Sequence, residues 1–420
     1  MKVTKKNKTA AVLTLLLSAA SLSHAAIPLY FPNENSYLTF ALSTGVTYTD
    51  NVFANHIKVD DLMFSVTPSV SIETGRDAIN RLSFSFSETF VNYLDNTTLD
   101  TQLASARLAY SFDPQSRLRV DVSASIDQLA QNDSIYWGSR DNNEQEYPEE
   151  PRKIIRRDYY AAGIDASYNL SEKLSTSFGF SYFNEHFGSL RTRYNDRQIY
   201  TVPLSLNYQI FEKIHLGISY SYSHTRIDPD WNSKNRVPGT QWFNPGTQVS
   251  HFIGLSTRGS YTAKLSFRGN VGFGYQSVED RYDFSPNSTQ SSIDDSYSTL
   301  NFSLSADYLL SEKSRLSLTS GRNFEVGGRA QNLTSTFARL NMTGYLNAFW
   351  QFNAYTSYIY QDFNFSNNRV DHVWGFGAGL SYLPVSWSRI SLSYRYLRDV
   401  SNRIQDFNVN HIMLSIEFKL

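Results

Sequence analysis

Apolar and polar residues alternate along almost the whole chain from Tyr37 onward, with no stretch of helical period between them. A period of two places successive side chains on opposite faces of a strand, so the pattern predicts one strand after another. One face repeats Leu, Ile, Val, Phe and Ala, and the other repeats Ser and other small polar residues. A packed soluble core would not place serine in its interior, whereas a lumen filled with water would. The alternation therefore predicts a sheet with one apolar face and one wet face.

The connections between the predicted strands alternate in length. Short turns lie at 171–173, 211–213 and 311–314, and long polar stretches lie at 129–157, 225–248 and 278–295. Short periplasmic turns and long external loops are the rule for outer-membrane barrels, which carry an even number of strands. We predict an all-β fold, a transmembrane antiparallel β-barrel of the bacterial outer membrane with about 18 strands. The strands are expected from Leu38 to Tyr48 and near 61–74, 81–93, 100–112, 117–128, 158–170, 174–184, 198–210, 214–224, 249–260, 264–277, 296–310, 315–322, 333–346, 349–361, 370–383, 389–398 and 407–420.

The first 25 residues have the pattern of a secretory signal peptide. Four lysines precede the apolar run from Ala10 to Ala20, and Ser23-His24-Ala25 fits a cleavage site. Loss of these four lysines and no acid takes the formal net charge from −1 to −5, which offers nothing to nucleic acid. We expect a signal peptide at 1–25, a short periplasmic tail at 26–36 and the barrel at 37–420, in the outer membrane of a Gram-negative cell.

Two sets of side chains follow from the parity of the strands. An aromatic belt is expected at the membrane interface near the short turns, because a tyrosine ring is apolar along its body and wet at its hydroxyl. Its members are Tyr110, Tyr168, Tyr208, Tyr308 and Tyr382. Charged residues of both signs are expected to line the pore, where they would orient a polar or anionic solute or simply pair with one another. They are Arg119, Asp121, Asp165, Arg268, Asp307, Arg315, Arg339 and Arg395.

Two positions need a local interpretation. Glu88 falls on the lipid face if the parity of its strand is kept, so we expect a β-bulge there that turns it inward. The run Gly375-x-Gly377-x-Gly379 lies inside a strand and opens no helix, so it is no nucleotide fingerprint. Its glycines are expected to leave room for a bulky neighbour such as Tyr355.

Catalysis finds little support in the sequence. The chain has no cysteine and no catalytic or phosphate-binding motif, and its histidines are scattered, so we expect no enzyme activity, cofactor or metal. A Ser, His and carboxylate brought together between strands would revive a barrel hydrolase.

The charged loop at 129–157 either folds into the mouth or is a solvated external loop, and the tryptophans Trp137, Trp231 and Trp242 lie in long loops.

The run Asp50-Asn51-Val52-Phe53, followed by Asp60-Asp61 and Val66-x-Pro68, resembles the opening of the β-barrel porin type 2 family. The resemblance covers residues 38–93 and implies a barrel associated with exopolysaccharide synthesis. It implies passage of a secreted polysaccharide beside periplasmic export or polymerisation proteins, in a chain that also meets outer-membrane lipids and the barrel-assembly machinery.

We therefore expect a non-enzymatic conduit for export of a biofilm or capsule polymer along a weakly polar wall. The alternative is a general diffusion porin for small polar solutes, and the third possibility is a barrel hydrolase. A constriction loop folded into the pore would favour the diffusion porin, and a wide lumen would favour the polymer conduit.

Overall fold

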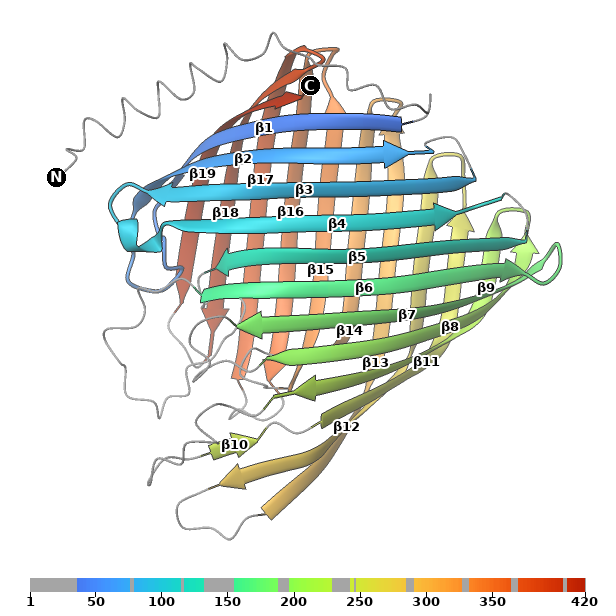
Figure 1. The fold of residues 1–420 in the computed structure, drawn as a ribbon. Coiled ribbons are helices and arrows are strands. Elements are labelled where there is room, and N and C mark those ends of the chain that lie inside the picture. The colour runs from blue at the N-terminus through green and yellow to red at the C-terminus, as the bar shows by residue number, and fades with distance from the viewer. Residues whose placement is uncertain are drawn as a thin grey trace.

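A computed structural model shows a single antiparallel sheet that closes on itself into a barrel (Figure 1). It describes residues 36–75, 79–114, 117–131, 155–187, 196–228, 242–244, 247–284, 291–326, 332–363, 369–402 and 406–419. The expected signal peptide and periplasmic tail lie outside these residues, apart from Ser36 at the end of the tail. Within the described residues, no helix has both the length and the apolar character needed to cross a membrane.

Eighteen strands cross the barrel, and each pairs with its neighbours in chain order. A nineteenth strand of three residues, β10, pairs with β12 outside this series. The predicted number of crossing strands is therefore confirmed. The strands are β1 (Ser36–Thr49), β2 (Asp61–Thr74), β3 (Asn80–Tyr93), β4 (Thr101–Phe112), β5 (Leu118–Gln131), β6 (Ile155–Asn169), β7 (Leu174–Phe187), β8 (Arg197–Phe211), β9 (Ile214–Ile227), β10 (Trp242–Asn244), β11 (Thr247–Ser260), β12 (Leu265–Phe284), β13 (Ser291–Ser311), β14 (Ser314–Val326), β15 (Asn332–Tyr345), β16 (Trp350–Phe363), β17 (Arg369–Val385), β18 (Ser388–Ser401) and β19 (Phe407–Lys419).

The barrel closes where the first strand pairs with the last. β1 pairs with β19 from Ala41↔Lys419 to Thr49↔His411, and on its other side it pairs with β2 along its full length. In Figure 1 the front strands β1 to β9 cross the direction of the back strands β13 to β19, as tilted strands on opposite walls of a barrel do. Closure pairs every crossing strand on both sides within the barrel wall, as a structure in lipid requires.

The two faces of the sheet differ as the alternation predicts. Large apolar side chains of one parity are exposed on the outside, for example Phe84 at 38% and Leu204 at 42% of their surface. The opposite parity faces the lumen. One rim carries the short turns, such as Ser171–Leu174, where Ser171 Oγ accepts the backbone N–H of Leu174 at 3.1 Å. We call this the short-turn rim and the other the long-loop rim.

The bulge expected at Glu88 is wrong. Val66 pairs with Phe90 and Ser69 pairs with Ser87, so the register of β2 and β3 continues unbroken past this position. Glu88 therefore stays on the outer face, where its carboxylate accepts a hydrogen bond from the Nε2 group of Gln102 on β4. The polar partner reduces the cost of placing a carboxylate there, so the strand needs no irregularity to turn it inward.

Several strands extend further than the alternation predicts. β12 and β13 continue to Phe284 and from Ser291, beyond the expected limits of 277 and 296, and their register shifts between Val278 and Arg281. Figure 1 shows this hairpin projecting past the neighbouring strands, with the short β10 beside it. The backbone pairing of β10 with β12 runs from Trp242↔Phe284 to Asn244↔Tyr282. Pairing thus continues where the sequence pattern no longer alternates.

Candidate functional site

The wall of the lumen is built mainly from small hydroxyl side chains that bond across strands. Ser177 and Ser205 lie 2.6 Å apart between their Oγ atoms, and Ser381 and Ser391 lie 2.8 Å apart. Because each hydroxyl both donates and accepts, such a wall satisfies itself and still offers weak bonds to water or to a solute. The short side chains also leave the lumen open. The wall is therefore suited to weak contacts with polar solutes.

The structure places all eight predicted pore-lining charges on the inward face, by the register that connects their strands. Only some of these charged side chains form ion pairs or hydrogen bonds with neighbouring side chains. Arg119 donates from Nε to Asp121 at 2.8 Å and lies 3.7 Å from Asp113, and Asp121 in turn is paired in register with Asp165. On β13, Asp307 accepts a hydrogen bond from Ser317 Oγ.

The four predicted arginines of the other wall lack such partners. Among the described residues, no carboxylate lies within ion-pair distance of Arg268, Arg315, Arg339 or Arg395, which are all exposed to the lumen. Arg339 instead bonds to Asn341 Oδ1 at 2.9 Å and lies 4.6 Å from the ring centre of Tyr355. Of the eight predicted charges, only Arg119 and Asp121 therefore form an ion pair with each other within the described residues.

The three glycines of β17 lie beside these groups. A Cβ atom built on Gly377 would overlap the ring of Tyr355, so only glycine leaves the ring its place. Tyr355 in turn supports the guanidinium of Arg339. The interpretation of the glycine run as space for Tyr355 is confirmed at Gly377, whereas Cβ atoms on Gly375 and Gly379 would first meet Ser357 and Asn353. Its consequence is a fixed position for one cation of the lumen.

The run Asp50-Asn51-Val52-Phe53 begins the first long connection and is bonded to the last strand. Asp50 accepts the backbone N–H of Asn410 at 2.7 Å and its Nδ2 at 2.8 Å, and it pairs with Lys58 at 2.7 Å. Burial raises the pKa of Asp50, but the hydrogen bonds from Lys58 and Asn410 outweigh it and hold the pKa below its usual value. Asn51 is almost fully buried and donates to the carbonyls of Asn55 at 2.6 Å and Asn408 at 2.9 Å.

The apolar half of the same run packs against the inside of the barrel. Val52 and Phe53 form a buried cluster with Tyr93 and Leu99, and Phe53 is only 3% exposed. Tyr93 has inward parity, as have the partly buried residues Met63 and Val91 that pack on the cluster. The first loop therefore folds over the inner wall at the long-loop rim.

The next residue of this loop, Ala54, reaches the other side of the β1–β19 seam. It packs with Phe407 and Val409 of β19 and with Leu397 of β18, which share the inward parity. Its φ of 44° lies in the left-handed region, which an alanine adopts only where its surroundings hold it. The sequence predicted a role in loop shape for this segment, and the structure adds that the loop lies inside the mouth.

The second long-side connection is held by Asp61, the first residue of β2. Its carboxylate accepts the backbone N–H groups of Leu94, Asp95 and Asn96 and the side-chain amide of Asn96, all between 2.8 and 3.1 Å. One buried carboxylate thus fixes the chain reversal between β3 and β4 beside the first loop.

A buried charged cluster at the long-loop rim escaped the sequence reasoning. Glu185 is fully buried between two cations, with Arg157 at 3.0 Å and Arg197 at 2.7 Å, and it accepts a hydrogen bond from the Tyr159 hydroxyl at 2.8 Å. These residues were missed because the predicted strands end at 184 and begin at 158 and 198. Extending the same parity by one residue would have placed Glu185 beside Arg197 on the inner wall.

A second buried pair lies at the same rim on β17, where Arg369 donates to Asp371 from both Nε and Nη2. Phe363 stacks on this guanidinium at 4.3 Å. Asp399 of β18 is buried nearby. Charge is therefore enclosed at the long-loop rim and left open to water further down the lumen.

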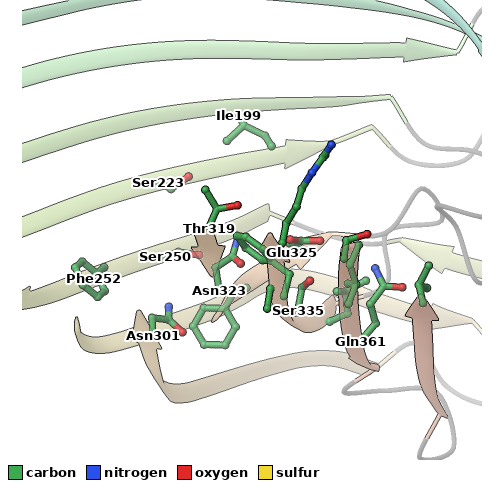
Figure 2. A pocket seen from close by; sticks show the side chains of 18 of the residues that line it. Ile199, Ser223, Ser250, Phe252, Asn301, Thr319, Asn323, Glu325, Ser335 and Gln361 are labelled. Atoms are coloured by element: carbon green, nitrogen blue, oxygen red, sulfur yellow. The ribbon is translucent and has the colours of Figure 1, made fainter. Parts of the chain in front are cut away.

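A cavity of about 1000 Å³ occupies the long-loop half of the lumen. Figure 2 shows Thr319, Asn323, Glu325 and Ser335 gathered on one part of its wall, with Phe252 to one side. The cavity also receives the cations Arg197, Arg339 and Arg395. Polar and charged groups from more than half of the strands thus line this cavity.

The predicted belt tyrosines all have outward parity near the short-turn rim. Tyr110, Tyr168, Tyr208 and Tyr308 expose between 37% and 52% of their surface, and the ring of Tyr382 packs at a tilt against Trp350, with 4.9 Å between the ring centres. The sequence missed a second set of outward aromatics toward the long-loop rim. Two of its tyrosines bond to histidines, Tyr220 to His251 at 2.9 Å and Tyr358 to His372 at 2.8 Å.

Some sequence predictions lie outside the described residues. They concern most of the loop at 129–157, of which 132–154 is not described, and the tryptophans Trp137 and Trp231. Of Trp242 only the backbone, in β10, is described. Among the described residues no hydrogen bond joins a serine to a histidine, and no group of three or more metal-ligating side chains is found.

A family model described as outer membrane β-barrel porin, MtrB/PioB, matches residues 149–420. The resemblance to porin type 2 rests on residues 38–93, outside this match, and stays a prediction. The sequence matches none of the curated proteins.

Solved structures give weak likenesses over most of the chain. One is the FrpB iron transporter of Neisseria meningitidis, with 10% identity, a TM-score of 0.44, and 93% of this chain and 82% of that chain covered. Another is OccK1 (OpdK) of Pseudomonas aeruginosa, with 8% identity, a TM-score of 0.45, and 91% of this chain and 99% of that chain covered. A third is the siderophore receptor PiuA of Acinetobacter baumannii, with 9% identity, a TM-score of 0.47, and 91% of this chain and 82% of that chain covered. At such TM-scores the likeness carries no argument about function.

Proposed function

Because this chain belongs to the outer membrane β-barrel porin family MtrB/PioB, we propose that it forms a passive, water-filled channel for small polar solutes in the Gram-negative outer membrane. Solutes would cross the lumen by forming and breaking weak hydrogen bonds with its hydroxyl-rich wall. Ser177 and Ser205, which hydrogen-bond to each other, are examples of these hydroxyls. No tight site is needed, because a channel must release what it binds. The chain would act without chemistry on the solute.

The first loop is the observation that favours a diffusion channel over a polymer conduit. Val52, Phe53 and Ala54 pack on inward side chains on both sides of the β1–β19 seam, so the loop occupies part of the mouth. A loop inside the mouth narrows the passage and selects by size, as a diffusion porin requires. A growing polysaccharide chain gains nothing from such a narrowing.

Liposome swelling tests this proposal directly. Purified barrel reconstituted in liposomes should admit neutral sugars, with entry rates that fall steeply from monosaccharide to trisaccharide. A barrel with a disordered first loop, for example one carrying N51A, should admit the larger sugars faster. Vesicles that stay impermeable to monosaccharides would refute the channel, provided that the protein shows the strand signature of a folded barrel.

Export of an exopolysaccharide is the second candidate, and the neutral hydroxyl wall favours it. Side chains such as Thr201 and Ser223, 3.2 Å apart, offer a sliding surface for sugar hydroxyls with no strong hold. Deletion of the gene separates the two candidates. Loss of surface polymer with unchanged uptake of small sugars would support export, and unchanged polymer with lower permeability would support diffusion.

The remaining proposals concern delivery and surroundings. We propose that residues 1–25 are removed as a signal peptide and that 26–36 form a periplasmic tail before the barrel. The outer face would contact outer-membrane lipids, and the barrel-assembly machinery would insert the chain. If export is the function, periplasmic polysaccharide export or polymerisation proteins would dock at the short-turn rim. Mass spectrometry of the mature N-terminus checks the first of these.

A further inference from the structure

Two arginines face each other on the inner wall near the short-turn rim. Arg258 of β11 and Arg268 of β12 are direct partners in the register, and both are exposed to the lumen. Side chains at such positions have Cβ atoms about 5 Å apart, where like charges destabilise a sheet. A sheet normally avoids this arrangement or places an acid beside it. The pair therefore carries a cost that calls for a functional explanation.

No carboxylate offsets the pair among the described residues. Arg258 donates from Nη2 to a hydroxyl, Ser175 Oγ on β7, at 3.2 Å, and Arg268 has no side-chain hydrogen bond or ion pair within the described residues. Asp307, on the strand next to Arg268, is the nearest acid by register; it accepts a hydrogen bond from Ser317 and forms no ion pair with either arginine. Both guanidinium groups thus face the water of the lumen without an ion-pair partner among these residues.

The surrounding groups hold Arg258 in this position. Gly217 on β9 lies between β11 and the strands that carry Ser175, and a Cβ atom there would fall 2.5 Å from Asn207 Oδ1. The same oxygen accepts a hydrogen bond from Ser256 at 3.2 Å. The hydrogen bond to Ser175 therefore holds the guanidinium of Arg258 over the inner wall, next to the fixed amide of Asn207.

Basic side chains continue on both sides of the pair. His215 of β9 is the register partner of Arg258, and its Nδ1 atom is buried without a hydrogen-bond partner among the described residues. On β14, at the same rim, Arg315 is also exposed to the lumen with no acid in ion-pair distance in the described part of the chain. Further along the lumen follow Arg339 and Arg395 at the cavity.

We propose that Arg258 and Arg268, with His215 beside them, form a binding site for anionic oxygen groups at the short-turn mouth. A carboxylate or phosphate group of a small solute would accept paired hydrogen bonds from a guanidinium group of this site, whose donors match such oxygens in pairs. The site draws anionic solutes into the lumen and gives the channel a preference for anions. This inference rests on the proposed channel and names the class of solute that it favours.

The expected preference follows from the two charges. A unit charge about 7 Å from a passing ion in water changes the energy of that ion by about RT, attractive for an anion and repulsive for a cation. Two such charges, each with its effect about halved by screening at 0.1 M salt, should give a ratio of anion to cation permeability on the order of fivefold. The preference should decline as salt is raised, because the screening length falls from about 30 Å at 0.01 M to about 10 Å at 0.1 M.

Reversal potentials across planar bilayers under a gradient of potassium chloride test the site. The wild-type channel should favour chloride, and R258Q/R268Q should lose the preference by about fivefold. The variant R258K/R268K should keep the preference for chloride while losing most of its binding of inorganic phosphate, because lysine lacks the planar pair of donors. Binding is measured by broadening of the phosphorus NMR signal, with acetate as a competing carboxylate.

A matched control lies at the same rim. The variant R119Q/D121N removes one arginine together with the acid that pairs with it, so it should leave the selectivity unchanged. A wild-type channel that favours potassium, or an R258Q/R268Q channel as selective as the wild type, would overturn the inference. A wild-type barrel that does not conduct would refute the proposed channel instead. In that case phosphate broadening in wild type but not in R258Q/R268Q supports the site, and equal broadening overturns it.

Discussion

Replacing Phe53 by alanine should release the first loop from the inner wall. Phe53 is 3% exposed and packs with Val52, Tyr93 and Leu99. Truncation of a buried phenylalanine costs about 3–5 kcal/mol. The hydrogen bonds of Asp50 to the last strand remain, so the cost falls on the attachment of the loop and not on the barrel. Because 1.4 kcal/mol corresponds to a factor of ten, the population of the open loop should rise about a hundredfold or more.

Limited proteolysis with trypsin measures this opening. Lys58 lies in the loop, and the backbone beside it is held by the hydrogen bond from Val52 N–H to the carbonyl of Val59 at 2.7 Å. A protease needs an extended chain, so it cuts after Lys58 only when the loop is open. When reclosing is faster than cleavage, the rate of cutting follows the open population. The rate for F53A should therefore exceed the wild-type rate by about a hundredfold.

The control is another phenylalanine on the same wall. Phe84 of β3 faces outward, is 38% exposed and does not belong to the loop cluster, so F84A should leave the cleavage rate unchanged. Cleavage of F53A within twofold of wild type would refute the reasoning. It would mean that polar bonds alone hold the loop and that its apolar contacts contribute little.

Three further outcomes are expected. The hydrogen bonds of Asp50 lower its pKa, so its contribution to loop stability is complete at pH values above the usual pKa of 3.8 and is lost as the pH falls through the pKa of the folded protein. Hydrogen exchange of the loop should show this loss. D50N should abolish the pH dependence. Q102L leaves Glu88 without its partner on the outer face and should lower the free energy of unfolding in lipid by about 1–2 kcal/mol. The stability of E88L/Q102L should match or exceed that of the wild type. Equal midpoints of urea unfolding for the wild type and both variants would contradict this. R157A leaves the buried Glu185 with one cation fewer and should lower the free energy of unfolding by about 3–5 kcal/mol in the same urea titration. An unchanged urea midpoint would contradict this.

The fold was predictable because lipid and water impose opposite demands on alternate residues. A register slip by one residue would turn every phenylalanine of β3 inward and every serine outward, so the parity is strongly specified. The bulge at Glu88 was predicted wrongly because parity considers each strand alone. The hydrogen bond that stabilises Glu88 on the outer face comes from Gln102 on the neighbouring strand.

The site was predictable only in part. Parity sufficed to place Arg268, Arg339 and Arg395 on the inner wall, since it needs nothing beyond the strand that carries them. It did not show which charges are paired, because pairing depends on the register between strands. The cost of placing Arg258 opposite Arg268 is visible only once that register is known.

The bonds between the first loop and the last strand also have a consequence for the order of assembly. Asp50 and Asn410 are separated by 360 residues along the chain, and Asn51 and Asn408 by 357. Contacts of such separation form late, because the ends of a long segment must first meet. The loop can bond to β19 only after β19 has paired with β1, so this part of its docking reports completion of the barrel. Until the final seam has formed, the loop would hold only its contacts with β3 and the β3–β4 connection.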